Sequence, residues 1–254
     1  MPGTPKGHDI GIYYLVQDEI WQNHSSAFFR HWIPGGESER VPERLDSAKG
    51  REGLLSRALT GAVLSRRLSC GPGELRLSRS KTGRPGFSHG SGPLELDFNI
   101  SHARDLVVCA VTDRGRVGID IEHVKRRVNL DIARRFFSAR ETAELENAPK
   151  AVQAEMFLQL WTLKESYVKA LGQGISRLPL GEFGFDLGGK RFFAQGAARR
   201  PGSWKFCMGG FHGEYHMALA LEGPVVPPLE IPIMKWEGET GFSPREKWTY
   251  DIIK

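Results

Sequence analysis

The chain has 254 residues, of which 40% are hydrophobic and 26% charged, with a formal net charge of +5. No segment approaches the roughly 20 apolar residues of a membrane-spanning helix, and the N-terminus has no apolar run typical of a signal peptide. We therefore expect a cytoplasmic globular protein with no membrane partner. The positive charge favours an anionic partner, but aromatic residues do not alternate with the basic clusters, which argues against nucleic acid.

The first half of the chain is predicted to begin with a strand over residues 9–17 and a helix over 54–67, where apolar residues recur at helical spacing. A polar, glycine-rich stretch follows, typical of turns and a short hairpin. Strand-like runs then cover 96–102, 105–112 and 116–122.

The second half turns helical over residues 129–148, in two pieces hinged near Phe137, and continues into a helix over 155–171. Strands are expected to return over residues 181–187, 191–196, 203–210 and 214–223. The segment 224–254 is rich in proline and charge and lacks clear periodicity, so we expect a tail that is draped over the body or partly disordered. The order of long helix then strands occurs twice, which indicates two similar halves.

The three cysteines, Cys70, Cys109 and Cys207, match no CxxC spacing of a metal or redox site. Free thiols of this kind are most often small core residues. We expect buried free thiols.

The run VGIDIE (117–122) alternates apolar and polar residues. Asp120 and Glu122 therefore share one face of the expected strand with Gly118, and the carboxylates project about 6.5–7 Å apart. Because Mg²⁺ prefers a few carboxylates completed by water and substrate phosphates, the pair can form half of a magnesium site. A solvated acidic face on an edge strand would give the same pattern.

The run WTLKESYVKALGQG (161–174) has the pattern of an amphipathic helix ended by glycine. Glu165 and Lys169 stand four residues apart on one face of it. A surface ion pair, worth a few tenths of a kcal/mol, would explain that spacing equally well.

Together FNISH (98–102), VGIDIE and WTLKESYVKALGQG resemble the 4'-phosphopantetheinyl transferases of the Sfp type, which activate carrier proteins of secondary metabolism. Their G-[IV]-D-[IVL]-E strand is matched by 118–122, and their W-[ST]-x-K-E-[SA]-x-x-K motif by 161–169. The resemblance extends over residues 10–222 and leaves the tail unexplained.

The resemblance implies an α+β fold of two pseudo-symmetric halves, 1–112 and 113–223, followed by the tail 224–254. Each half would pack a long helix on a small, mainly antiparallel sheet, with coenzyme A in the cleft between them. The implied reaction moves the phosphopantetheine arm of coenzyme A to a serine of an acyl or peptidyl carrier protein and releases adenosine 3',5'-bisphosphate. Because one chain supplies both halves, the family implies a monomer.

Carried over from the family, Asp120, Glu122 and Glu165 are the expected Mg²⁺ ligands. The metal would neutralise charge that develops on the pyrophosphate. Lys169 would lie against the pyrophosphate and stabilise the leaving group. The general base for the carrier serine is Glu165, Glu122 or a metal-bound water.

Four further residues match positions that contact coenzyme A in the family. Ser101 and His102 would contact its phosphates, although a histidine after a strand is often a turn residue. Arg57 would bind the 3'-phosphate, a task suited to its planar fork of donors, although most helical arginines are solvated. Arg84 stands where the family often has lysine.

Glu141 matches a family acidic position, but with Ser138 three residues earlier it predicts a capping box.

Two other functions use similar residues. A metal-dependent phosphodiesterase or nuclease needs a water-activating histidine or more carboxylates than the motifs supply. A catalytically silent relative that only binds coenzyme A has no need of the metal set. The basic surface would attract an acidic carrier domain.

Overall fold

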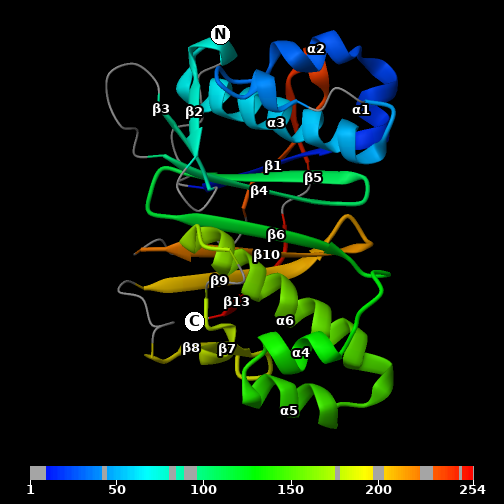
Figure 1. Ribbon diagram of the computed structural model, residues 1–254, viewed down its shortest axis with the longest axis vertical. Helices are drawn as coiled ribbons and strands as arrows, with labels where there is room; N and C mark the ends of the chain where they lie inside the picture. The colour runs from blue at the N-terminus through cyan, green and yellow to red at the C-terminus, as the bar shows by residue number, and fades with distance from the viewer. Residues whose placement is uncertain are drawn as a thin grey trace. The chain divides into compact units, whose positions relative to one another are not determined.

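The computed structural model describes residues 10–41, 45–79, 84–88, 96–174, 178–196, 203–223, 231–245 and 248–253. The chain divides into two compact units, Met1–Arg114 with Ile231–Lys247 and Gly115–Glu230 with Trp248–Lys254. Each unit combines helices with a mainly antiparallel sheet, which confirms the α+β class (Figure 1). Within the described residues, no helix is both long and apolar enough to cross a membrane.

The first unit is built on a five-stranded sheet. Its strands are β1 (Ile10–Val16), β4 (Asp97–Ala103), β5 (Leu106–Thr112), β11 (Ile233–Trp236) and β12 (Phe242–Pro244). They lie in the order β12-β11-β1-β5-β4, and only the β1–β11 pair is parallel. A separate hairpin pairs β2 (Arg76–Arg79) with β3 (Pro85–Ser88).

The helices of this unit are α1 (Gln17–Asn23), α2 (Ser26–His31) and α3 (Ala48–Leu68), with short 3₁₀ turns η1 (Ser38–Arg40), η2 (Pro72–Glu74) and η6 (Gly238–Thr240). The sequence predicted α3 but not α1 or α2. The α3 helix begins earlier than its apolar pattern, because the Ser47 hydroxyl accepts a hydrogen bond from the Gly50 amide and caps the first turn.

The core of the first unit lies between α3 and the sheet. Leu54, Leu55 and Leu59 of α3 are fully buried in one cluster with Val107 of β5 and Trp236 of β11. Burial of this apolar face explains the helical spacing seen in the sequence.

The second unit is built on a four-stranded antiparallel sheet. Its strands are β6 (Val117–His123), β9 (Trp204–Phe211), β10 (Tyr215–Glu222) and β13 (Asp251–Ile253), in the order β13-β9-β10-β6. A hairpin of β7 (Phe183–Asp186) and β8 (Arg191–Ala194) lies outside it.

The helices of this unit are α4 (Asp131–Phe136), α5 (Ala139–Asn147) and α6 (Lys150–Leu171), with a 3₁₀ turn η4 (Leu180–Glu182). The break between α4 and α5 confirms the hinge near Phe137. The Ser138 hydroxyl and the Glu141 carboxylate form the predicted capping box. Gly172 ends α6 in the left-handed region, at a φ of 66°.

The α6 helix packs closely on β6 at Gly118. A Cβ atom on Gly118 would lie 2.0 Å from the carbonyl oxygen of Ser166 and 2.5 Å from the amide nitrogen of Ala170. Backbone atoms of α6 therefore occupy the space that any side chain would need. The side of β6 that carries Gly118 also carries Asp120 and Glu122, so both carboxylates lie on the α6 side of the strand.

A buried ion pair fixes α6 to the elements around it. The Lys164 ammonium lies 2.9 Å from the Glu141 carboxylate and donates to the carbonyl oxygens of Leu180 and Phe183 at 2.9 and 2.6 Å. Glu141 also accepts a bond from the Phe185 amide. Burial lowers the pKa of Lys164, and the charge of Glu141 opposes that shift.

The segment after residue 223 contributes strands to both units, contrary to the expected draped or partly disordered tail. Residues 231–245 add β11 and β12 to the first sheet, and 248–253 add β13 to the second. Short strands of three or four residues leave too little periodicity to be recognised.

All three cysteines are free thiols. Cys109 and Cys207 are buried as predicted, and burial raises the pKa of both thiols. Cys70 is half-buried.

The close packing at Gly118 predicts that Gly118→Ala lowers the free energy of unfolding by about 1–3 kcal/mol, because β6 and α6 must move apart. Gly210→Ala is the matched control, since Gly210 also lies in a strand but a Cβ atom there would have no packing contact within 4 Å. We expect that control to change stability by less than about 0.5 kcal/mol in urea denaturation. Equal effects of the two substitutions would contradict the packing.

The buried ion pair predicts that Lys164→Met destabilises the protein by about 3–5 kcal/mol, because the Glu141 charge is left buried without its cation. Lys150→Met, on the exposed first turn of the same helix, should cost less than about 0.5 kcal/mol. Urea denaturation of both variants checks the difference. A Lys164→Met protein as stable as the parent would show that the pair is dispensable.

Candidate active site

The acidic residues of β6 and the charged residues of α6 meet in the second unit. Asp120 is buried, and the Lys169 ammonium lies 2.7 Å from its Oδ1 atom. Glu165 is half-buried one helical turn before Lys169. The structure therefore gathers Asp120, Glu122, Glu165 and Lys169 in one place, on two elements that the close packing at Gly118 holds together.

Two of the carboxylates have strongly perturbed acidities. Burial raises the pKa of Glu122 to about 7, the charge of Asp120 adds to the rise, and Arg126 and Lys169 oppose it. Burial and then Asp120 likewise raise the pKa of Glu165 to about 7. Perturbed carboxyl groups of this kind concentrate at catalytic sites.

The donor set suits a divalent cation, since Mg²⁺ takes carboxylate oxygens and three carboxylates repel one another here. In the described part of the chain, however, no three Asp, Glu, His or Cys side chains are grouped closely enough to hold a metal ion. Protein cations contact two of the carboxylates instead: Lys169 binds Asp120 and Arg126 binds Glu122. The three carboxylates suit the metal chemically, but Lys169 and Arg126 must move away from them before a metal ion can bind.

Arg126 is a member of the site that the sequence did not predict. Its Nη1 atom donates to Glu122 Oε1, and its guanidinium lies 5.6 Å from the ring centre of Trp161 on α6. Arg126 follows β6 in a turn, so no strand or helix periodicity places it beside Glu122. The cluster of basic residues at 125–127 was its only signal in the sequence.

The remaining predicted residues lie in the first unit. Arg57 donates to the Glu37 carboxylate at 3.2 Å and to the Gly53 carbonyl at 2.7 Å. Arg84 binds the Asp97 carboxylate at 2.5 Å. Both guanidinium groups are therefore engaged by the protein itself.

Ser101 and His102 lie side by side in sequence on β4 but differ in exposure. Ser101 is buried, whereas the His102 side chain is half exposed, with its Nδ1 atom 3.1 Å from the Glu52 carboxylate of α3. His102 thus reaches the helix that lines the pocket described next.

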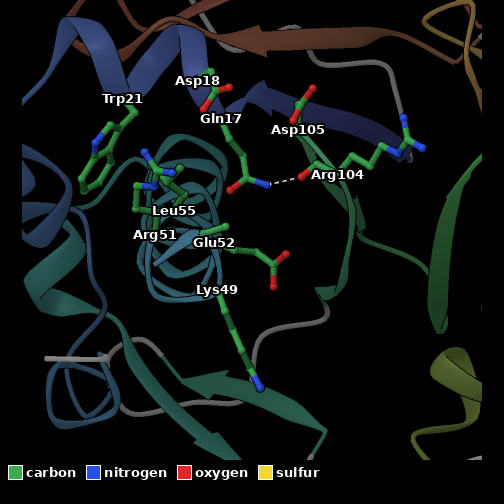
Figure 2. Close-up of a pocket in the computed structure, with 10 residues that line it drawn as sticks. Gln17, Asp18, Trp21, Lys49, Arg51, Glu52, Leu55, Arg104 and Asp105 are labelled. Atoms are coloured by element: carbon green, nitrogen blue, oxygen red, sulfur yellow. Dashed lines mark hydrogen bonds between the residues drawn. The ribbon is translucent and has the colours of Figure 1, made fainter. Parts of the chain in front are cut away.

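A pocket of about 410 Å³ opens between α1, α3 and the turn that joins β4 to β5. Figure 2 shows the Arg51 side chain next to Trp21, and the Arg51 guanidinium lies 5.8 Å from the indole ring centre. The side chains that line it are Gln17, Asp18, Trp21, Ala48, Lys49, Arg51, Glu52, Leu55, Arg104 and Asp105. Three of them are basic and three acidic.

No motif in the sequence points to Lys49 or Arg51, although both belong to the same helix as Arg57. The pocket contains Arg51 but not Arg57. The two arginines lie on the same helix, and only tertiary contacts show which of them lines the pocket.

Comparison with known proteins shows the family of the chain. The model of the 4'-phosphopantetheinyl transferase superfamily matches residues 116–220, and that of the 4'-phosphopantetheinyl transferase N-terminal region matches residues 19–114. The first of these matches contains the whole carboxylate site.

Individual relatives carry the same name. The chain is 32% identical to 4'-phosphopantetheinyl transferase Sfp of Bacillus subtilis (strain 168), over 69% of this chain and 76% of that protein. It is 36% identical to 4'-phosphopantetheinyl transferase ffp of Bacillus subtilis over the same shares. It is 33% identical to 4'-phosphopantetheinyl transferase HetI of Nostoc sp. over 48% of this chain and 52% of that protein. By these matches and its motifs, the chain belongs to the 4'-phosphopantetheinyl transferase superfamily and is a transferase of the Sfp type.

Proposed function

We propose that this protein transfers the 4'-phosphopantetheine arm of coenzyme A to a serine hydroxyl of an acyl or peptidyl carrier protein, in a Mg²⁺-dependent reaction. The serine oxygen forms a bond to the phosphorus that bears the pantetheine arm. The bond from that phosphorus to the leaving phosphate breaks, and adenosine 3',5'-bisphosphate departs. The observation that carries the proposal is the meeting of Asp120, Glu122, Glu165 and Lys169 in one half-buried site of a family member.

The serine hydroxyl must lose its proton during the transfer. A half-buried carboxylate one helical turn from Lys169 can accept that proton as a general base. Glu165 is our proposed base. Glu122 and a metal-bound water are the alternatives.

Asp120, Glu122 and Glu165 are the proposed ligands of Mg²⁺, which would supply positive charge to the phosphate oxygens when bound. Lys169 is the proposed contact of the pyrophosphate. Its ammonium lies 2.7 Å from Asp120, and its charge also acts on Glu122 and Glu165. A cation held there stabilises negative charge on the leaving phosphate.

We further propose that the pocket of the first unit binds a phosphate of coenzyme A through Arg51 and Lys49. Arg57 stays a weaker candidate, because Glu37 and a backbone carbonyl engage its guanidinium. The carrier is proposed to be acidic, since the protein has a net charge of +5. We also propose that the carrier belongs to secondary metabolism and that the protein is a monomer.

Intact-mass measurement of a purified apo carrier protein tests the reaction. With this protein, coenzyme A and Mg²⁺, we expect a gain of about 340 Da, one phosphopantetheine arm. Glu165→Gln should slow the gain by at least about 100-fold, because the base is lost, and a chelator should abolish it. Glu155→Gln, on an exposed part of the same helix, is the matched control and should keep the parent rate. No gain with any class of carrier, despite bound coenzyme A, would contradict the proposal.

Calorimetric titration with coenzyme A distinguishes the two arginines of α3. Arg51→Gln should weaken binding by about 10–100-fold, because a hydrogen bond to a charged phosphate is worth about 1.5–3 kcal/mol. Arg57→Gln should weaken it by less than about threefold, because Glu37 and the Gly53 carbonyl already engage its guanidinium.

Repeating both titrations with 3'-dephospho-coenzyme A identifies the phosphate. A penalty for Arg51→Gln that disappears with this ligand assigns the 3'-phosphate to the pocket. A larger penalty for Arg57→Gln than for Arg51→Gln would overturn our choice of residue.

A further inference from the structure

The turn after β6 holds Arg126 in a defined position. The Arg126 amide donates to the His123 carbonyl at 2.9 Å, and the Lys125 amide donates to His123 Nδ1 at 3.0 Å. The Val124 amide donates to the Glu214 carbonyl at 2.9 Å, and the Lys125 ammonium lies 2.7 Å from the Glu214 carboxylate. Backbone and side-chain bonds therefore fix the turn from which Arg126 extends.

The guanidinium of Arg126 lies between two groups of the site. On one side it donates to Glu122, and on the other it lies over the Trp161 ring, one helical turn before Glu165. The charge of Arg126 acts on Glu165 as well as on Glu122. An ordinary surface ion pair is exposed and worth little, but Glu122 keeps only 16% of its side chain exposed.

The position of Arg126 conflicts with metal binding by Glu122. The atom that accepts from Arg126 is a carboxylate oxygen, which is also the atom type that Mg²⁺ would need. Arginine does not lose its proton in proteins, so its charge can leave the carboxylate only if the side chain moves. The ring of Trp161 is a second partner of the guanidinium besides Glu122.

We propose that Arg126 is a built-in counter-ion which competes with the divalent cation for Glu122 and so sets the metal affinity of the site. This inference rests on the proposed function, because it takes Glu122 as a metal ligand. Arg126 is a positioning residue: it neutralises the site at rest and must release Glu122 before the cation is fully bound. Removal of the arginine should tighten metal binding, whereas removal of a supporting residue would weaken it.

The test is metal binding itself, measured by titration of Mn²⁺ followed by electron paramagnetic resonance, without coenzyme A or carrier protein. Arg126→Gln should lower the Kd for Mn²⁺ by about tenfold, the size expected when one charge-assisted hydrogen bond no longer has to be broken. Arg127→Gln removes the same charge one residue further along, where the side chain is exposed, and should change the Kd by less than about twofold.

Arg126→Lys serves if the glutamine variant does not fold. It keeps the charge without the planar fork and should lower the Kd relative to the parent protein, by less than the roughly tenfold expected for full removal of the charge. The double variant Glu122→Gln/Arg126→Gln is the decisive comparison. Its Kd for Mn²⁺ should equal that of Glu122→Gln alone, because the carboxylate for which Arg126 and the metal compete is absent.

The outcomes separate the two proposals. If Glu122→Gln weakens Mn²⁺ binding but Arg126→Gln leaves it unchanged, weakens it, or matches Arg127→Gln, the competition is refuted and the metal assignment stands. If Glu122→Gln leaves Mn²⁺ binding unchanged, the metal assignment fails and the role of Arg126 fails with it. A tightening that is specific to Arg126 and lost in Glu122→Gln supports both.

Discussion

The candidate active site depends on how closely the backbone of α6 approaches β6. Gly118 permits that approach, because Ser166 and Ala170 occupy the space where its side chain would lie. The same separation lets the Lys169 ammonium reach Asp120 at 2.7 Å. A side chain at Gly118 would push the helix outward and move Glu165 and Lys169 away from the carboxylates of β6. The glycine of the strand motif is thus a packing requirement of the site.

The distance between α6 and β6 does not decide which side chains of α6 face the strand. Lys164 fixes the rotation of α6 about its own axis. Successive helical residues point about 100° apart, so the direction of Lys164 decides that of Glu165. Burying an ammonium is costly unless it is fully paired, and here Glu141 and two carbonyl oxygens receive it. The adjacent lysine and glutamate therefore have separate tasks: the first anchors the helix and the second faces the site.

The sequence predicted those parts of the molecule that depend on local periodicity. The strand β6, the glycine end of α6 and the capping box at Ser138 follow from neighbours in the chain. The pairing of β11 with β1 joins residues more than 200 positions apart, and nothing local in β11 specifies its partner. The short helices α1 and α2 likewise lack an apolar repeat long enough to be recognised. The same distinction applies to the functional residues. The carboxylates lie within a strand and a helix, which local periodicity predicts. Arg126 instead reaches Glu122 across a turn whose geometry depends on His123 and Glu214.

The charge balance of the site links the proposed substrate to the proposed metal. Asp120, Glu122 and Glu165 are partly neutralised at rest by Lys169 and Arg126, which keeps a half-buried cluster of like charges tolerable. A pyrophosphate brings more negative charge than one carboxylate, so it competes with Asp120 for the Lys169 ammonium. If Lys169 turns to the substrate, Asp120 loses its counter-ion, and a divalent cation becomes the group best able to replace it. Coenzyme A draws the Lys169 ammonium away from Asp120, and the bound metal replaces that positive charge. Binding of coenzyme A and binding of the metal should therefore favour each other.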